Sequence, residues 1–309
     1  MPNLKSARHH WWPECVSRYW ATEDGTTGWI KPDGQCLRVR PKQLGQIGNG
    51  HHIKPSRNFS HSTRWDTSFE CEFDTADNSF PEIISWLKNL NYDFKPSQKL
   101  CDRFLEQSAG DDVLRKLTEC VVSLAVRSPM NRAASVSVAE RLRGTMPNQE
   151  REILIGFNMR NSQRMVSDRI GANAKFAVLV SQGKEFIFGD GFFQNFKSGI
   201  NPKILAPITP NLSVIVTRPT TFTVSPRLST IVLTDDEVDQ CNHAVQVYSR
   251  QALYFRSHKP EVVEAFTCNE HLQYTDPDNP IDTLLRSIPG IPPRDSSLDF
   301  LIRNPQNEP

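Results

Sequence analysis

The chain has 309 residues, of which 38% are hydrophobic and 23% are charged, so it can bury a sizeable core and is not wholly disordered. Its 36 Lys and Arg residues against 35 Asp and Glu residues give a net charge of +1, which excludes a strongly basic protein that coats nucleic acid. No apolar run reaches about 18 residues, the length of a membrane span, and residues 1–20 lack the apolar centre of a signal peptide. The seven cysteines form no CxxC pair. We therefore expect a cytoplasmic protein with reduced thiols and no membrane partner.

Residues 1–64 form a basic segment that is rich in tryptophan and histidine. They carry ten Lys and Arg against four acids, whereas residues 65–112 carry eleven acids against four bases. Turn signals at Glu23-Asp24-Gly25 and Pro32-Asp33-Gly34 predict short strands and an antiparallel β ribbon. The basic segment either docks on the acidic segment of the same chain or contacts a partner, and we expect its tryptophans to build a local core.

Residues 65–170 are predicted to be mainly helical. Two sets of apolar residues recur at helical spacing: Ile83, Ile84, Leu87 and Leu90, then Val113, Leu114, Leu117, Val121 and Leu124. Asp111 and Asp112 suit the start of the second helix, because acidic side chains stabilise a helix N-terminus. Ser137 and Glu140 have the spacing of a capping box and predict the start of a further helix.

Residues 175–256 are predicted to form strands and one helix. Residues 176–180 and 185–188 flank a turn and indicate a hairpin, and residues 212–217 and 229–233 indicate two more strands. Thr234-Asp-Asp-Glu237 then opens a helix with capping-box chemistry. Residues 276–309 hold seven prolines and are expected to be an extended or loosely packed tail.

These elements predict an α+β fold. It consists of an N-terminal antiparallel β ribbon, a helical middle, and a C-terminal mixed or antiparallel sheet with a closing helix. We find no internal repeat and no long linker, and therefore expect one α+β domain over residues 1–275, followed by the Pro-rich tail.

The order of several short motifs over residues 9–256 resembles the uncharacterised microbial family catalogued as domain of unknown function four-two-three-eight. The motifs are His9-His10-Trp11-Trp12-Pro13, Gly48-Asn49-Gly50-His51, Arg127-Ser128-Pro129, the strand that ends at Asp190, Pro207-Ile208-Thr209-Pro210, and Asn242. The family's Ser-Asp-Asn-Pro step keeps only Asp190 here, because Gly189, Gly191 and Phe192 replace its other residues. The resemblance implies no established activity.

His9 and His10 are candidates for a general base or a metal ligand, because imidazole titrates near neutral pH and binds divalent metals. In an extended chain their side chains point to opposite faces, so one of them at most serves a given site. His51 and His52 follow a Gly-Asn-Gly turn that allows them to approach the first pair. Two histidines and the carboxylate of Asp190 would suit a divalent metal as cofactor. The structural alternative is a set of satisfied polar contacts beside the tryptophans.

Asp190 lies between two glycines after an apolar strand, where a carboxylate suits a site but also suits a plain turn. Arg127 follows an apolar helix and is a candidate phosphate contact, the alternative being a carbonyl or acid partner. Asn158 and Asn242 are candidate substrate-binding residues, although Asn side chains often bond locally. No Gly-x-Ser-x-Gly motif and no activated cysteine context is present, so a protein nucleophile is not expected.

Two functions follow from these residues. The first is a hydrolase that acts on a phosphodiester or another polar substrate, with a base or ligand from His9 or His10, a carboxylate from Asp190 and a phosphate contact from Arg127. The alternative is a non-catalytic binding or regulatory module that contacts a protein or nucleic-acid partner. An enzyme requires these side chains in one cleft, whereas a binding module scatters them and exposes an apolar patch.

Overall fold

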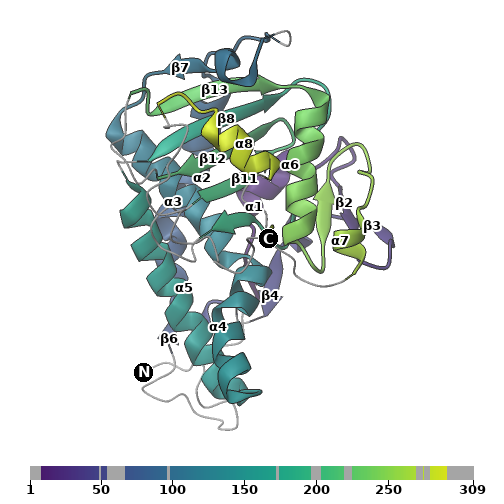
Figure 1. Ribbon diagram of the computed structural model, residues 1–309. Coiled ribbons are helices and arrows are strands. Elements are labelled where there is room, and N and C mark those ends of the chain that lie inside the picture. The colour runs from purple at the N-terminus through teal and green to yellow at the C-terminus, as the bar shows by residue number, and fades with distance from the viewer. Residues whose placement is uncertain are drawn as a thin grey trace, which may run out of the picture.

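The computed structural model describes residues 8–48, 50–53, 67–95, 98–171, 174–195, 203–218, 225–268, 274 and 279–290. Asn49, Trp65 and the part of the predicted tail beyond residue 290 lie outside these described residues. The fold is α+β, with antiparallel strands near the N-terminus, helices in the middle and a mixed sheet toward the C-terminus (Figure 1). This confirms the predicted fold class. No helix of the described part is long and apolar enough to cross a membrane.

The elements follow one another along the chain as short strands, then helices, then longer strands. The strands are β1 (Arg8–His10), β2 (Thr27–Ile30), β3 (Cys36–Val39), β4 (Gln46–Gly48), β5 (His52–Ile53), β6 (Thr67–Ser68), β7 (Leu105–Gln107), β8 (Lys175–Ser181), β9 (Phe188–Gly189), β10 (Phe193–Asn195), β11 (Lys203–Thr209), β12 (Leu212–Thr217), β13 (Leu228–Leu233) and β14 (Leu253–Phe255). The helices are α1 (Glu14–Ser17), α2 (Asp74–Lys88), α3 (Asp111–Arg127), α4 (Pro129–Arg143), α5 (Asn148–Ile170), α6 (Asp235–Tyr248), α7 (Glu264–Thr267) and α8 (Pro280–Arg286). Short 3-10 turns include η1 (Arg18–Trp20) and η3 (Glu70–Phe73).

The large sheet has the strand order β10-β11-β12-β8-β13-β7 and is antiparallel except for the β8–β13 pair. Every residue of β8, β12 and β13 is buried, so both faces of the sheet are covered. Helix α3 packs against β11 and β12, and α6 packs against β13 and β10. The predicted strands at residues 212–217 and 229–233 are confirmed.

The predicted hairpin between residues 176–180 and 185–188 is wrong. Strand β8 pairs with β12 and β13 instead, and residues 185–187 are not strand. Backbone N–H groups of this segment find other acceptors, because Lys184 donates to the Asp235 carboxylate at 3.0 Å and Phe186 donates to the Pro210 carbonyl at 2.8 Å. The chain then crosses into the smaller sheet β3-β2-β14-β9, where β9 pairs with β14.

The predicted helical runs become α2 and α3, and the predicted turns bracket β2 and lead into β3. Ser137 does not begin a helix, because α4 begins at Pro129 and Ser128 accepts the capping hydrogen bond from the Asn131 N–H. The Ser137 hydroxyl donates instead to the Ala134 carbonyl at 2.9 Å within α4. Thr234 and Glu237 do form the predicted capping box of α6.

Within the predicted tail, residues 280–286 are helical rather than extended. Residues 280–286 form α8, whose Ile281, Leu284 and Leu285 are buried in the main core. The Asn279 side chain caps this helix, and Lys203 bonds the Asp282 carboxylate at 2.9 Å. A proline at the first helical position is compatible with a helix, because its missing N–H would be unpaired there in any case.

Trp12 and Trp20 join the N-terminal strands to the rest of the molecule. Both are fully buried, and the Trp12 ring stacks on Phe188 with ring centroids 4.0 Å apart. The Trp20 indole N–H donates to the Ile208 carbonyl at 3.2 Å. Gly45, at φ +67°, lets the backbone pass close to Trp12, since a Cβ there would lie 2.5 Å from the Trp12 Cβ. The expected tryptophan core is thus present and includes Phe188 of the C-terminal half.

Replacing Thr234 by alanine removes the capping box of α6, whereas Ser137→Ala removes a hydroxyl that caps nothing. We expect Thr234→Ala to lower the free energy of unfolding by about 1 kcal/mol, the typical cost of a lost N-cap. Ser137→Ala is expected to change it by less than about 0.5 kcal/mol. Urea denaturation of both variants measures the difference, and equal losses would contradict the assignment of Ser137 to the interior of α4.

Candidate functional site

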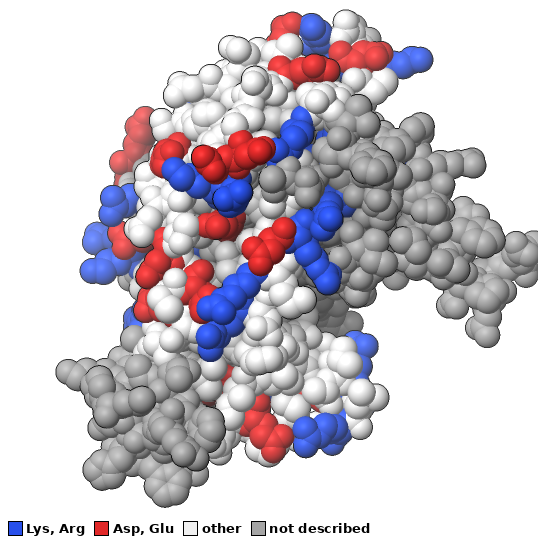
Figure 2. Space-filling model, turned by 90° about the vertical axis from the view of Figure 1, so that its left-hand side faces the viewer, with Lys and Arg blue, Asp and Glu red and all other residues white. Residues whose placement is uncertain are grey.

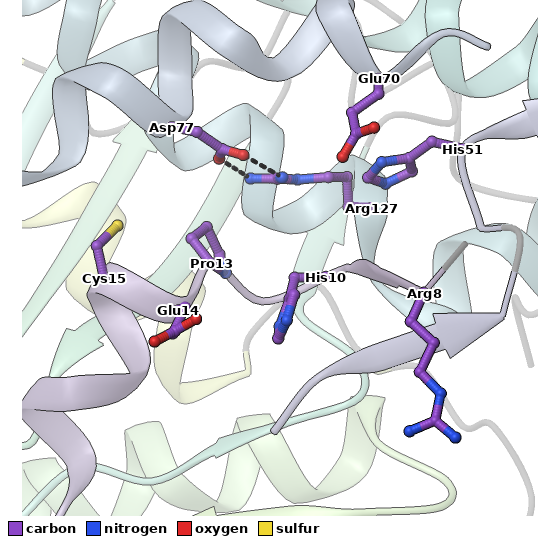
Figure 3. Close-up of a pocket in the computed structure, with 9 residues that line it drawn as sticks. All are labelled: Arg8, His10, Pro13, Glu14, Cys15, His51, Glu70, Asp77 and Arg127. Atoms are coloured by element: carbon purple, nitrogen blue, oxygen red, sulfur yellow. Dashed lines mark hydrogen bonds and ion pairs between the residues drawn. The ribbon is translucent and has the colours of Figure 1, made fainter. Parts of the chain in front are cut away.

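The candidate site is a cavity of about 200 Å³ between the N-terminal ribbon and helices α1, α2 and α3. We call it the site cavity. Figure 3 shows it between two groups of side chains, one from the ribbon and α1 and the other from α2, α3 and the loops beside them. Its lining residues are Arg8, His10, Pro13, Glu14, Cys15, His51, Glu70, Asp77 and Arg127.

Strand pairing decides which histidine of the N-terminal pair lines the cavity. β1 pairs with β4 so that His9 lies opposite Ile47 and His10 opposite Gln46. Successive side chains of a strand point to opposite faces, as expected for this pair. His9 is buried with 3% of its surface exposed and is not a lining residue, whereas His10 is half-buried and lines the cavity.

His10 is held in one tautomer by its two hydrogen bonds. Its Nδ1 lies 3.1 Å from the Leu44 carbonyl oxygen, which only accepts, so Nδ1 carries the proton and donates. Its Nε2 lies 3.4 Å from the Gln46 side-chain nitrogen, which only donates, so Nε2 is the unprotonated acceptor. An imidazole whose Nδ1–H is held by a carbonyl keeps its lone pair on Nε2, and here that lone pair accepts only the long hydrogen bond from Gln46, which a water molecule would have to replace for His10 to act as a general base.

The second histidine pair does approach the first, as the sequence suggested. The His9 ring lies 4.9 Å from the His51 ring and 4.4 Å from the His52 ring, measured between centroids. The His51 backbone N–H donates to the His9 Nδ1 at 3.2 Å, and the His9 Nε2 lies 3.5 Å from a Glu70 carboxylate oxygen. His9 therefore supports the wall of the cavity and places His51.

His51 is a neutral imidazole at the cavity. Only 3% of its surface is exposed, and its ring packs on Phe73 at 4.9 Å and Phe69 at 5.7 Å. Burial, followed by the positive charge of Arg127, lowers the pKa of His51 to about 2. Its Nδ1 has no hydrogen-bond partner within the described part of the chain, so the cavity contains one unused polar atom of a buried ring.

Arg127 is the last residue of α3 and is 99% buried, with 1% of its surface exposed. Its guanidinium bonds both carboxylate oxygens of Asp77 at 3.0 and 2.6 Å, as the dashed lines in Figure 3 show. The same group lies 4.8 Å from the Phe73 ring centroid. A buried guanidinium needs such a bidentate partner. Arg127 thus has the acid partner that was the alternative to phosphate binding, and it also forms part of the cavity wall.

Cys15 contributes a thiol to the cavity. Burial, and then the negative charge of Asp77, raise the pKa of this thiol above its usual range. The thiolate is the nucleophilic form of cysteine, so Cys15 is poorly suited to attack a substrate at neutral pH. This agrees with the absence of an activated cysteine context in the sequence.

Asp190 has a different role from the one proposed for it. Its carboxylate accepts backbone N–H groups of Arg250, Gln251 and Ala252 at 2.9 to 3.2 Å, and it is not a lining residue of the cavity. Burial raises the pKa of this carboxyl, opposed by those amides. Gly191 is explained by packing, since a Cβ there would lie 1.7 Å from the Tyr248 carbonyl oxygen.

The two candidate asparagines also serve the fold. Asn158 donates to the Ser135 carbonyl at 2.8 Å and joins α5 to α4. Asn242 accepts the Ile187 N–H at 2.9 Å and donates to the Glu185 carbonyl at 3.0 Å. Both side chains therefore form hydrogen bonds with the backbone, which was the alternative to substrate binding, and neither lines the site cavity.

A metal site built from the histidines and Asp190 is not assembled. Among the described residues, no group of three or more His, Cys, Asp or Glu side chains is placed to hold a metal ion. The physical reason is that Asp190 is engaged by the backbone at the start of β14, and that His9 uses its Nδ1 to accept the His51 N–H.

Sequence reasoning did not single out Arg8, Glu14, Glu70 or Asp77 as site residues. A partial signal existed, because Glu70 and Asp77 lie in the acidic segment, on which the basic N-terminal segment would dock in one of the two alternatives left open by the sequence. The described contacts between these segments include the approach of the Glu70 carboxylate to the His9 Nε2 at 3.5 Å and the packing of α1 against α2. No pattern within a single sequence indicates that Asp77 pairs with Arg127.

No match was found for this chain among family models, curated proteins or solved structures.

Asp77→Asn keeps the size of the side chain but leaves the buried charge of Arg127 without its counter-charge. We expect the free energy of unfolding to fall by about 3 kcal/mol, because a buried charge without a partner is costly. Glu82→Gln on the same helix is the control, since it removes an exposed ion pair with Lys116 and is expected to cost less than about 1 kcal/mol. Equal losses in urea denaturation would contradict a structural role of the Asp77–Arg127 pair.

His51 makes stability fall in acid. Its pKa is about 2 when folded against a usual value of 6.5, so between these values the unfolded chain binds the extra proton. The contribution of His51 to the free energy of unfolding is then fully present above about pH 6.5, and it falls by roughly 2 kcal/mol when the pH is lowered to about 5. We expect His51→Gln to lose this part of the pH dependence. Denaturation curves of both proteins at several pH values test it, and parallel slopes would refute it.

Proposed function

We propose that this protein is a hydrolase that binds a phosphodiester or a similarly polar substrate in the site cavity. The observation that carries the proposal is the convergence of His10, His51 and Arg127 on one cavity, from segments far apart in the sequence. Imidazole and guanidinium groups that meet in a concave site are the groups that acid–base hydrolysis of such esters uses.

His10 acts as the general base in this proposal. The Leu44 carbonyl holds its proton on Nδ1, and the Nε2 lone pair accepts a proton from a water molecule that takes the place of the Gln46 amide. Water is the nucleophile, because the Cys15 thiol has a raised pKa. Proton removal from the attacking water by a positioned base typically contributes about 10²- to 10⁴-fold in rate.

Arg8 is the group that we assign to the negative charge of the substrate. Of the acidic lining residues, Asp77 is neutralised by Arg127, Glu14 bonds Arg18 at 3.1 Å, and Glu70 lies 3.5 Å from the His9 Nε2. The exposed Arg8 guanidinium bonds the neutral Gln46 side chain at 3.4 Å and pairs with no acid among the described residues. A guanidinium matches two phosphate oxygens in a bidentate way, so Arg8 suits one phosphodiester charge.

His51 contributes a hydrogen bond to the substrate rather than a proton. Its low pKa keeps the ring neutral across the physiological range, so it does not serve as a cationic acid. Its Nδ1, which lacks a partner within the described residues, gains one when a polar group of the substrate enters the cavity. Positioning by such a neutral group adds specificity for polar over apolar substrates.

The motif resemblance supports the same location. Two of the motifs on which the resemblance rests, the His-His-x-x-Pro start and the Arg-Ser-Pro step, contribute His10, Pro13 and Arg127 to one cavity. The Asp190 step, which has lost most of the family pattern, lies elsewhere and serves the backbone of the chain.

The alternative is a module that binds a polar group of a protein or nucleic-acid partner without turnover. One observation favours it, because the predicted catalytic carboxylate of Asp190 is absent from the cavity. Figure 2 is less favourable to a nucleic-acid partner on the face that it shows, where Lys and Arg alternate with Asp and Glu.

Hydrolysis of bis(4-nitrophenyl) phosphate tests the enzymatic proposal. We expect the wild-type chain to release nitrophenol and His10→Gln to lower kcat/KM by at least about 100-fold, because the general base is lost. Arg8→Gln is expected to raise KM more than it lowers kcat, because it removes a binding contact.

The matched control is His258→Gln, which changes an exposed histidine far along the chain and is expected to leave kcat/KM unchanged. Thermal melting shows that each variant is folded. A wild-type chain without activity, or a folded His10→Gln variant with full activity, would reject the hydrolase and leave the binding module.

A further inference from the structure

A further cavity, of about 320 Å³, lies at the C-terminal end of α2, and we call it the second cavity. It shares no lining residue with the site cavity, which meets α2 nearer the start of the helix, at Asp77. Along the helix Lys88 lies about 16 Å from Asp77, at about 1.5 Å of rise per residue. The lining residues of the second cavity are Tyr19 of η1, Leu87 and Lys88 of α2, Tyr92, residues 180–182, residues 209–212 and Arg256.

The floor of the second cavity is part of the hydrophobic core. Leu87 is 2% exposed and Val180 and Leu212 are 6% exposed, and all three belong to the main core. Val180 and Leu212 are direct partners in the β8–β12 pair, so their side chains stand on the same face of the sheet. An apolar floor favours a ligand with an apolar body, because water is released from both surfaces on binding.

Two tyrosines give the wall of the second cavity an aromatic character. Tyr19 is half-buried and packs against the core, whereas Tyr92 follows α2 and is 48% exposed. Aromatic rings pair with other flat rings in offset-stacked or edge-to-face arrangements, which adds to the gain from buried area. The wall therefore favours an aromatic ring over an aliphatic chain as the apolar body of the ligand.

The charge of the second cavity is positive. Its basic lining residues are Lys88 and Arg256, and no acid is among the described residues that line it. The Arg256 guanidinium is already neutralised, because it bonds the Glu185 carboxylate at 2.8 Å and the Asn211 side-chain oxygen at 3.3 Å. The Lys88 ammonium lies 4.2 Å from the Tyr19 ring centroid and pairs with no acid among the described residues. One positive charge thus remains for a ligand.

The position of Lys88 favours a carboxylate over a phosphate. Asp93, the nearest acid along the chain, does not compete for Lys88, because it pairs with Lys95 at 3.3 Å. Lys88 is the last residue of α2, so the negative end of the helix dipole lies beside it. A phosphate monoester carries a charge of about −1.5 to −2 near pH 7, which one ammonium beside a negative helix end does not balance. A carboxylate carries a single charge, which the ammonium does balance.

The size and the rigid wall of the second cavity suit one small molecule. Its volume corresponds to roughly ten water molecules of about 30 Å³ each, and it is near the lower end of the range of ligand pockets, about 300–1,000 Å³. The Ser181 hydroxyl donates to the Lys184 carbonyl, and the Asn211 amide donates to the Ser181 carbonyl at 3.3 Å. These bonds fix the loops around the cavity before a ligand arrives, which lowers the entropic cost of binding.

We propose that the second cavity binds a small aromatic monocarboxylate. Its carboxylate pairs with the Lys88 ammonium, and its ring lies against Tyr19 and Tyr92 over the apolar floor. The apolar floor, the two tyrosines and the single unbalanced charge each select one part of this ligand. The proposal does not depend on the proposed hydrolase activity.

Isothermal titration calorimetry of the full chain with 2-naphthylacetate tests the proposal. We expect a dissociation constant below about 1 mM, which ligands of this size reach in a formed pocket. The neutral analogue 2-naphthylacetamide is expected to bind about 10-fold more weakly, because it cannot form the charged hydrogen bond with Lys88.

Lys88→Met keeps the apolar stem of the side chain and removes its charge. It is expected to raise the dissociation constant of 2-naphthylacetate about 10-fold and to leave that of 2-naphthylacetamide unchanged, whereas Lys88→Arg retains most of the affinity for the acid. Tyr92→Leu is expected to weaken both probes about 5-fold, because the ring contact is lost. Both positions are exposed, so thermal melting is expected to show folded variants.

Lys31→Met is the matched control. Lys31 also lies over an aromatic ring, that of Trp29 at 5.6 Å, but it lines neither cavity, so binding is expected to be unchanged. A wild-type chain that does not bind 2-naphthylacetate at about 10 mM, or that binds the amide equally well, would overturn the proposal, as would a Lys88→Met variant with wild-type affinity. Binding that is lost in Arg8→Gln and kept in Lys88→Met would place the acid in the site cavity and would also overturn it.

Discussion

The stacking of Trp12 against Phe188 is the contact on which the candidate site depends. It places the segment that follows β1 against β9, which lies more than half the sequence away, and both rings are fully buried. Because Trp12 follows His10 by two residues, this contact holds the β1 segment against the body of the protein. Burial of two large aromatic side chains contributes several kcal/mol, enough to order a short terminal ribbon.

The electrostatics of the site cavity follow from that placement. The ribbon lies beside the ion pair between the buried Arg127 of α3 and the partly exposed Asp77 of α2, and after burial the positive charge of Arg127 contributes to the low pKa of His51. A neutral imidazole, an oriented imidazole and a shielded guanidinium thus share one small space. The same arrangement costs stability in acid, since His51 has to remain uncharged in the folded state.

The α4–α5 hairpin supports one wall of the site cavity. Its inner side holds the loop that carries His51, because the Arg132 guanidinium bonds the Gly50 carbonyl at 2.5 Å and Gly156 packs against Ile53.

Local patterns in the sequence determined much of the secondary structure. The apolar spacing of α2 and α3, the capping box at Thr234 and the strands β12 and β13 depend on neighbours within a few residues, so one sequence suffices to predict them. The opposite orientation of His9 and His10 follows from strand geometry in the same way.

Only the tertiary structure decided which of these residues meet. Asp190 and Asn242 are residue types that are common in functional sites, yet their polar atoms form hydrogen bonds with backbone groups of distant segments. The expected hairpin after β8 does not form, because α6 and the β11–β12 turn supply acceptors for the backbone N–H groups of that segment. Arg127 pairs with Asp77, which lies fifty residues away along the chain. Such pairings are set by the need of buried polar groups for partners, and that need is met across the fold rather than along the sequence.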